Sequence, residues 1–336
     1  MKRPAPPSSA SDAPPPARFA GGLSRLWPEG MRPGSAASLA LAVSGGPDSL
    51  ALLLLAAAAL PGRVHAATVD HGLRPASAAE AAFVGEVCAG LGVSHATLAV
   101  AVAPGNVQSE ARVARYAALA GWAGAVGAGA LATAHHADDQ AETLLARLNR
   151  ASGVAGLAGV RARGRVPGAE LPLLRPLLDW RRAELAAVVA GAGLTAVDDP
   201  SNGDDRFDRV RLRKAMAGAD WLDVAAIARS AQHLAEADAA LDWATAREWR
   251  EGVTPGALGS YVYRPQAPRA IALRVIALLV TRLGGEEPRG SAVARLFDTL
   301  VAGQPASLGD LVARPGPDGW AFAPAPPRRA SAGLRP

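Results

Sequence analysis

The first half of the chain alternates short apolar runs with longer segments of helical character. Residues 39–43 form an apolar run that ends in Ser44-Gly45-Gly46, and residues 48–60 then have the length and apolar content of a core helix. Short apolar runs bounded by turn residues are typical of buried strands. We therefore predict a strand, a glycine turn and a helix over residues 39–60.

The same alternation continues through three further units. The predicted strands cover residues 64–69, 93–100 and 130–134, and the predicted helices cover residues 75–91, 108–126 and 138–150. Strands that alternate with helices of this length favour an α/β fold, a parallel twisted sheet with helices on both faces. Ligands of such folds bind at the carboxyl ends of the strands.

The alternation stops beyond residue 217. Helical patterns follow at residues 222–250, 269–283 and 292–300, with strand patterns at 261–263 and 320–322. We predict a disordered Pro/Ala-rich extension at 1–30, an α/β domain at 31–217, a smaller mostly helical domain at 218–324 and a Pro/Arg-rich tail at 325–336. A transit peptide is an alternative for the extension, although its prolines disfavour an amphipathic helix.

Composition narrows the class of protein. Half of the 336 residues are hydrophobic, which is enough for a sizeable core, and no apolar run suggests a membrane helix. Cys88 is the one cysteine, so an internal disulfide and a four-cysteine zinc site are excluded. With no secretory signal, the sequence indicates a cytoplasmic protein without a membrane partner.

The positive charge depends on arginine. The formal net charge is +5, and Lys2 and Lys214 are the only lysines among 35 basic residues. Arginine binds phosphate through a rigid fork of donors, so this surface fits a polyanionic partner such as nucleic acid. GC-rich codon usage explains the same excess of arginine equally well.

The first cluster with candidate chemistry is the loop Ser44-Gly45-Gly46-Pro47-Asp48-Ser49, between a predicted strand and a predicted helix. Glycines allow backbone amides to approach an anion, and a helix N-terminus adds partial positive charge. The loop lacks the Gly-Lys-Ser/Thr of a Walker A motif, so transfer of the γ-phosphate is disfavoured. Asp48 is a candidate ligand for Mg²⁺, which prefers oxygen ligands together with substrate phosphates.

Two further clusters follow the second and fourth predicted strands. Asp70, in Asp70-His71-Gly72, is placed to meet a nucleotide's ribose or base. After the fourth strand, His135-His136-Ala137-Asp138-Asp139-Gln140-Ala141-Glu142 supplies paired acids on a helix, which can bind metal or accept a proton. A zinc or dinuclear metal site is an alternative for this string, and an N-capping role for one aspartate fits either interpretation.

The fourth cluster is rich in arginine. Asp198-Asp199-Pro200-Ser201-Asn202 precedes Arg206, Phe207, Arg209, Arg211 and Arg213. Alternating arginines with one aromatic residue suit a phosphate backbone and a stacked base. A solvated basic helix face is the alternative.

Together these motifs resemble the tRNA(Ile)-lysidine synthases of the PP-loop (N-type ATP pyrophosphatase) superfamily, whose fold is Rossmann-like. The matching segments are residues 43–49, 69–75, 106–116, 135–157 and 198–213. The resemblance implies a ligase that forms a carbon–nitrogen bond. ATP adenylates the C2 oxygen of the wobble cytidine in a tRNA(Ile) with a CAU anticodon, and free L-lysine then displaces AMP to give lysidine.

The resemblance also implies roles for particular residues. Ser44 to Ser49 would bind ATP, with Asp48 on Mg²⁺ and the phosphates, and Arg115 would neutralise charge near the α-phosphate or the base. His135, Asp139 and Glu142 would line the lysine and cytidine site. The residues that would bind substrate or tRNA are Asp70, Arg112, Arg206, Arg209 and Arg211. Arg209 and Arg211 remain alternatives for binding the carboxylate of lysine.

Some alternatives remain. The related tRNA thiolases normally need reactive cysteines or an iron–sulfur cluster, and the related amidotransferases need a glutaminase domain, so both are disfavoured here. A non-catalytic tRNA-binding protein with a degenerate ATP fold is a rival of another class. The chain is too short for the further tRNA-reading domain of some relatives, and family members are often dimers, which leaves a homodimer open.

Overall fold

The computed structural model describes residues 13–70, 76–100, 107–197 and 208–325. The chain divides into two compact units, Met1–Ala235 and Glu236–Pro336. The change of unit falls inside a helix, α10 (Val224–Gly252), and lies later than the predicted boundary at residues 217 and 218.

The first unit contains a six-stranded sheet with the order β3-β2-β1-β4-β6-β5. Its strands are β1 (Ser38–Ala42), β2 (Val64–Asp70), β3 (Ser94–Ala99), β4 (Ala128–Ala132), β5 (Arg163–Arg165) and β6 (Pro172–Leu174). All neighbouring pairs are parallel except β5 with β6, which is antiparallel. The predicted α/β fold is confirmed, and β5 and β6 are additions that the sequence pattern did not predict.

The sheet order reverses direction at β1. The chain proceeds outward from β1 to β2 and β3, and then returns to place β4 on the other side of β1. The carboxyl ends of β1 and β4 are therefore neighbours at a topological switch point, where α/β sheets bind ligands.

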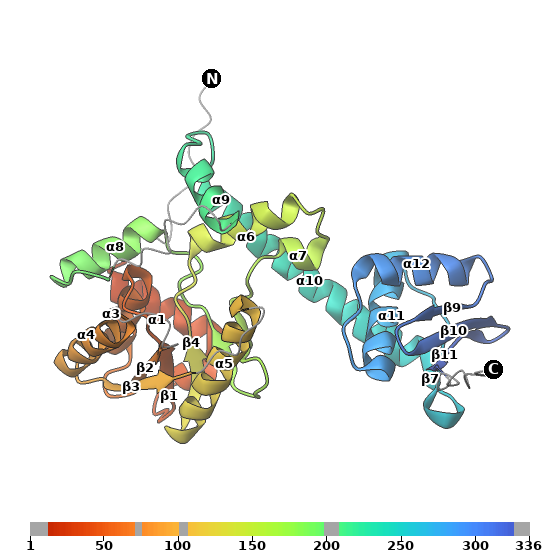
Figure 1. Cartoon of the computed structure of the whole chain (residues 1–336), viewed down its shortest axis with the longest axis horizontal. Helices are drawn as coiled ribbons and strands as arrows, with labels where there is room; N and C mark the ends of the chain where they lie inside the picture. Colours follow the sequence, from red (N-terminus) through yellow and green to blue (C-terminus); the bar gives the residue numbers. More distant parts are fainter. Residues whose placement is uncertain (1–12, 71–75, 101–106, 198–207, 326–336) are drawn as a thin grey trace, which may run out of the picture. The chain divides into compact units, whose positions relative to one another are not determined.

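The two faces of the sheet have separate cores because successive strand residues point to opposite faces. Leu39 and Leu41 of β1 pack with α3 (Pro47–Ala59), whereas Ala40 packs with α5 (Val107–Ala125) on the other face. Figure 1 shows these helices on opposite sides of the strands, with α4 (Ala76–Gly90) beside α3. Both faces of β1, the strand that leads into the Ser44–Ser49 loop, are therefore covered by helices.

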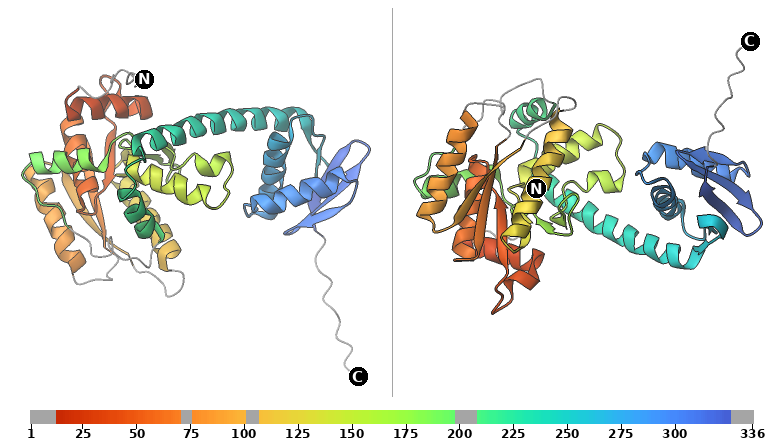
Figure 2. Two further views of the ribbon diagram at one scale, coloured as in Figure 1. Left: turned by 90° about the horizontal axis from the view of Figure 1, so that it is seen from above. Right: turned by 60° about the horizontal axis from the view of Figure 1, so that its bottom comes forward.

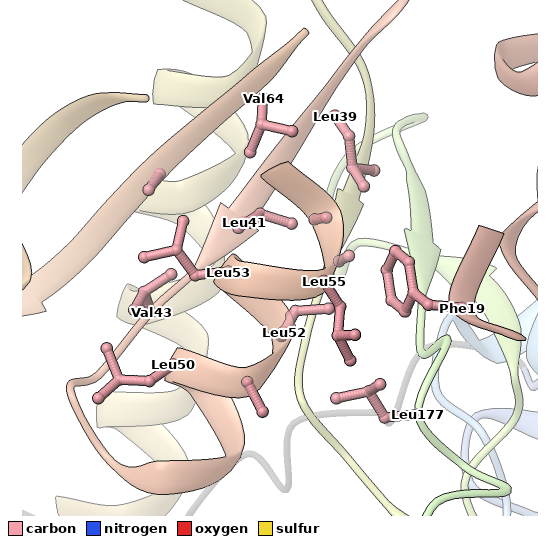
Figure 3. Packing of buried hydrophobic residues seen from close by; sticks show 14 of the residues in the cluster. Phe19, Leu39, Leu41, Val43, Leu50, Leu52, Leu53, Leu55, Val64 and Leu177 are labelled. Atoms are coloured by element: carbon pink, nitrogen blue, oxygen red, sulfur yellow. The ribbon is translucent and has the colours of Figure 1, made fainter. Parts of the chain in front are cut away.

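One segment of the predicted disordered extension is folded. Residues 15–31 form α1 (Pro15–Leu26) and α2 (Pro28–Met31), so the prediction is wrong for this part. Phe19 and Leu23 are 0% exposed and Trp27 is 1% exposed. Figure 3 shows Phe19 beside Leu55 of α3. These three residues recur at a spacing of four along the chain, which places them on one side of the segment.

The remaining helices of the first unit follow β4 and β6. They are α6 (Ala137–Leu148), α7 (Val154–Leu157), α8 (Arg182–Gly191) and α9 (Asp208–Ala217). The predicted helix at 138–150 is thus confirmed as α6, and α6 begins directly after the candidate string His135-His136.

The second unit combines helices with a sheet. Its helices after α10 are α11 (Arg269–Gly284) and α12 (Gly290–Val301), and its 3₁₀ turn is η2 (Ala257–Gly259). The strands are β7 (Val253–Pro255), β8 (Tyr261–Tyr263), β9 (Ala306–Leu308), β10 (Leu311–Gly316) and β11 (Gly319–Pro324).

These strands form an antiparallel sheet with the order β7-β8-β11-β10-β9. The predicted strands at 261–263 and 320–322 pair with each other, with Trp320 opposite Tyr263. Figure 2 shows α11 and α12 against this sheet, and Ile276, Leu296 and Phe322 share the core between them. The predicted helices are thus confirmed, and the sheet adds strands β7, β9 and β10, which the sequence pattern did not predict.

Among the residues that the structure describes, no helix is long and apolar enough to cross a membrane.

Candidate active site

The Ser44–Ser49 loop connects β1 to α3 and leaves the amino end of α3 open. Gly46 is the N-cap of α3, and no side chain caps the first turn. Ser49 Oγ instead donates to Gly46 O at 3.0 Å and accepts the Ser44 N–H at 3.1 Å, which fixes the turn. The uncapped amides and the helix dipole make this turn a site for an anion such as a phosphate.

Gly45 is required by the shape of this turn. Its φ is +85°, in the region that favours glycine. A Cβ at this position would lie 3.3 Å from Val197 and 3.4 Å from Val84, and Gly45 O accepts the Val197 N–H at 3.1 Å. The glycine thus allows the loop to pack closely against the segment after α8.

A pocket of about 540 Å³ lies at the carboxyl ends of the strands. Its lining includes five of the six loop residues, together with Arg115, His135, Asp139 and Arg209. Candidate residues from four separate parts of the sequence therefore share one cavity at the switch point of the sheet. Lining residues that the sequence did not single out include Thr68, Glu80, Tyr116, Thr133 and Val197.

His135 is the pocket's neutral base. Burial lowers the pKa of His135 to about 4, although Asp139 opposes this shift, and the nearby Arg175, Arg209 and Arg112 add to it. One ring nitrogen, Nδ1, shares a hydrogen bond of 3.0 Å with Thr133 Oγ1. The ring is therefore uncharged at neutral pH and fixed by the strand from which it emerges.

Arg115 supplies positive charge beside the same cavity. Its guanidinium carbon lies 5.4 Å from the centre of the Tyr116 ring, and that of Arg112 lies 5.0 Å from it. Burial lowers the pKa of Arg115, and within the described chain neither arginine pairs with a carboxylate. A partly buried cation without a counterion fits an anionic ligand.

Asp139 and Glu142 are held by arginines of α9. Arg209 donates from Nη2 to Asp139 Oδ1 at 2.7 Å and from Nε to Glu142 Oε2 at 2.8 Å, and Arg213 Nε donates to Glu142 Oε1 at 2.9 Å. Arg182 lies 3.7 Å from the same Oε1. Glu142 is 2% exposed and does not line the pocket, so it lies behind Asp139 and Arg209.

Asp138 and Asp139 have different functions in the structure. Asp138 accepts the backbone N–H of Arg182 at 2.9 Å and faces Arg181, so it joins α6 to the start of α8. Asp139 faces the pocket. Burial alone would raise the pKa of Asp139, but charge from His136 and Arg209 lowers it, so Asp139 is ionised at neutral pH.

Asp48 has a carboxylate oxygen suited to a cation. Asp48 Oδ1 is buried and hydrogen-bonds to no described residue. Mg²⁺ is commonly bound by one or two carboxylates together with substrate phosphates, and this oxygen beside the phosphate loop fits that pattern. Among the described residues, no group of three or more His, Cys, Asp or Glu side chains could hold a metal by itself.

The other candidates lie away from the cavity lining or cannot be placed. Asp70 accepts a hydrogen bond of 2.6 Å from Ser77 Oγ, and Arg112 and Arg211 are not among the lining residues. Arg206 lies outside the described residues, as do His71 and the string at 198–202. Arg182 was missed from the sequence, and Arg213 was included in the arginine-rich cluster without being related to Glu142, because no local pattern connects either arginine to that carboxylate.

The uncapped glycine loop at the switch point of a parallel sheet is the architecture of a PP-loop ATP-binding protein, and the family model of the PP-loop domain matches residues 24–219. The chain belongs to the tRNA(Ile)-lysidine synthase family. It is 52% identical over 292 residues to tRNA(Ile)-lysidine synthase of Novosphingobium aromaticivorans, covering 86% of this chain and 89% of that protein. It is 41% identical over 297 residues to that of Zymomonas mobilis, covering 87% and 89%.

A solved structure shares the fold at low sequence identity. The U34-tRNA thiolase NcsA from Methanococcus maripaludis, with its 4Fe–4S cluster, aligns with a TM-score of 0.54 over 66% of this chain and 79% of that chain. The two are 15% identical, so this likeness bears on the fold alone.

Proposed function

We propose that this chain is a tRNA(Ile)-lysidine synthase, a ligase that uses ATP to join free L-lysine to the wobble cytidine of a tRNA(Ile) with a CAU anticodon. The family membership supports the proposal. The observation that carries it is the single pocket that contains the phosphate loop at one end and Arg115, His135, Asp139 and Arg209 around it. A nucleotide and an amino acid can therefore react within one cavity.

In the first step the C2 oxygen of cytidine attacks the α-phosphorus of ATP, and the bond to pyrophosphate breaks. The amides of the Ser44–Ser49 loop stabilise the departing pyrophosphate, because no side chain caps the first turn of α3 and its N–H groups can bind an anion. Asp48 would hold a Mg²⁺ ion, which offsets negative charge on the phosphates. Arg115 compensates the charge that develops at the α-phosphate.

In the second step an amine of lysine attacks C2, and AMP leaves with the former C2 oxygen. A carbonyl oxygen is a poor leaving group until it is esterified to phosphate, so adenylation makes this step feasible. Asp139 pairs with the ammonium group of lysine that does not react, and Arg209 binds the carboxylate of lysine. Neutral His135 is placed to accept the proton that the attacking amine loses.

Glu142 has a different role from the one the resemblance implied. Because three arginines surround its carboxylate, we assign it the task of orienting Arg209 and Arg213. The second unit is proposed to bind the tRNA, and Arg112, Arg211 and Arg206 are proposed to contact its phosphates. We also propose that the protein is cytoplasmic and forms a homodimer.

ATP–pyrophosphate exchange that depends on tRNA tests the adenylation step. The proposal predicts exchange with a CAU-anticodon tRNA(Ile) and its loss in Asp48→Asn. A non-catalytic tRNA-binding protein would bind the same tRNA without exchange, and that result would reject the proposal. Exchange without transfer of lysine would keep the adenylation step and require another nucleophile.

A further inference from the structure

His136 is buried beside two residues of the pocket, Asp48 and Asp139, but does not line the pocket itself. Its side chain is 1% exposed, so no substrate can reach the ring directly. The backbone around it is fixed, because His136 forms a parallel bridge with Leu177 and the Ala137 N–H donates to Trp180 O at 2.9 Å. These two backbone contacts fix the position of His136 at the start of α6.

Nε2 of His136 is a donor in either ionisation state of the ring. In the neutral ring Nδ1 accepts the N–H of Asp138 at 3.2 Å, which leaves the proton on Nε2. Burial alone would lower the pKa of His136, but the carboxylates beside it, those of Asp138, Asp48 and Asp139, raise this pKa to about 9. The protonated ring carries a proton on Nε2 as well. Nε2 lies at ion-pair distance from two carboxylates, 3.3 Å from Asp48 Oδ2 and 3.6 Å from Asp139 Oδ2, and forms no hydrogen bond with a described residue. A buried donor thus faces carboxylates from two elements, the loop and α6.

In both Asp48 and Asp139, the two carboxylate oxygens have different surroundings. Asp139 Oδ2 also accepts the backbone N–H of His136 at 3.1 Å, while its Oδ1 faces Arg209. Asp48 Oδ2 faces His136, while its Oδ1 has no hydrogen-bond partner among described residues. One oxygen of each carboxylate therefore lies beside His136, while the other oxygen bonds Arg209 in Asp139 and has no described partner in Asp48.

We propose that His136 is a positioning residue, which holds Asp48 and Asp139 at a fixed spacing and so sets the ATP end of the pocket relative to the lysine end. The identity of the two ends rests on the proposed function. Partners behind a ligating group typically change metal affinity or activity by about 10- to 100-fold when they are removed. His136 acts in this way through Asp48.

Two substitutions distinguish the positioning of Asp48 and Asp139 from a contribution of His136 to stability alone. His136→Asn keeps an acceptor for the Asp138 N–H, since asparagine is a good N-cap, but its amide is too short to reach Asp48. His136→Gln places an amide donor as far out as Nε2 but weakens the cap. His65→Asn is the matched control, because His65 bonds Ser94 Oγ at 2.7 Å and does not line the pocket.

The measurements are the dissociation constant of ATP with Mg²⁺, by equilibrium dialysis, and the midpoint of thermal unfolding. We expect His136→Asn to unfold near the wild-type temperature and to bind ATP about 10-fold more weakly or worse. His136→Gln is expected to unfold earlier and to bind within about 3-fold of the wild type. His65→Asn should leave ATP binding unchanged.

Wild-type affinity for ATP in His136→Asn would overturn the proposal. So would a loss of ATP affinity that is proportional to the loss of thermal stability in both variants. Combined with Asp48→Asn, His136→Asn should cause no further loss of affinity, and an additional loss would show that it does not act through Asp48. Dialysis uses neither tRNA nor lysine. A failure to form lysidine would therefore reject the proposed function, and the ATP affinities of the wild type and the His136 variants could still be compared.

Discussion

At the scale of single residues, Gly45 shows how backbone conformation prepares the phosphate loop. A larger residue would be strained at the Gly45 φ of +85°, and its Cβ, 3.3 Å from Val197, would need that side chain to move by a few tenths of an ångström. Gly45→Ala should lower the free energy of unfolding by about 1–2 kcal/mol through strain and should also weaken ATP binding, because the added methyl displaces the loop.

Gly62→Ala is the matched control for this prediction. Gly62 has φ +70° but no atom within 4 Å of an added Cβ, and it does not line the pocket. Denaturant unfolding and ATP titration should show similar strain in both variants but weaker binding in Gly45→Ala alone. Equal ATP affinity in the two variants would contradict the explanation.

Glu142 is a residue whose role is set by its surroundings. Glu142→Gln removes the charge that Arg209, Arg213 and Arg182 share, so we expect a loss of about 2–3 kcal/mol in the free energy of unfolding. The KM for lysine should also rise, because Arg209 loses one of its two anchors. Chemical denaturation and steady-state kinetics measure the two effects.

Glu251→Gln is the control for Glu142. Glu251 pairs with Arg247 on an exposed helix face, and its loss should change stability by no more than about 0.5 kcal/mol. If Glu142→Gln were as stable as this control and still failed to use lysine, Glu142 would contact lysine directly, contrary to the account.

At the scale of elements, α1 is an integral part of the first unit. Phe19→Ala should lower its stability by about 3–5 kcal/mol, because the ring is 0% exposed and its removal leaves a cavity beside α3. Ser24→Ala, at an exposed position of the same helix, should change stability by no more than about 0.5 kcal/mol. Differential scanning calorimetry measures both, and equal midpoints would show that α1 is dispensable.

The elements also show what the sequence could predict. The strands and helices from β1 to α6 were predicted to within a few residues, because each strand is a short apolar run bounded by turn residues. α1 was missed because its proline, alanine and glycine content outweighed the spacing of Phe19, Leu23 and Trp27. β5 and β6 were missed because strands of three residues carry too little periodicity.

The sequence motifs that form the site were predictable, but the contacts between their side chains were not. The loop and the string at residues 135–142 follow strands, and the parallel sheet brings their ends together. Which of two adjacent histidines faces the pocket depends on the turn into α6, and the sequence does not specify that turn. The ion pair of Glu142 with Arg213 spans 71 positions, so no local pattern could reveal it.

At the scale of the whole molecule, the second unit contains a titratable group that limits its stability at high pH. Burial, together with the hydrogen bond of 3.0 Å from Tyr263 to Glu248, raises the pKa of Tyr263 above its ordinary value near 10. Unfolding exposes a phenol that ionises more readily. The stabilisation is therefore complete below pH ~10 and is lost as the pH rises above it.

Tyr263→Phe tests this pH dependence. The variant should lose about 1 kcal/mol at neutral pH, where its hydrogen bond to Glu248 is absent, and should be less sensitive to alkali than the wild type. Urea unfolding of both proteins between pH 7 and 11 measures the difference. Stability curves that run parallel over this range would show that Tyr263 does not titrate on unfolding.

The central claim for the whole molecule is that one pocket adenylates a tRNA base and then transfers lysine to it. The most direct measurement is incubation with ATP, Mg²⁺, labelled lysine and a CAU-anticodon tRNA(Ile), followed by detection of the label in the tRNA. We expect stable incorporation of lysine, accompanied by AMP and pyrophosphate, and its loss when the wobble C is replaced by U. The absence of label from the CAU tRNA, or equal labelling of both tRNAs, would contradict this claim.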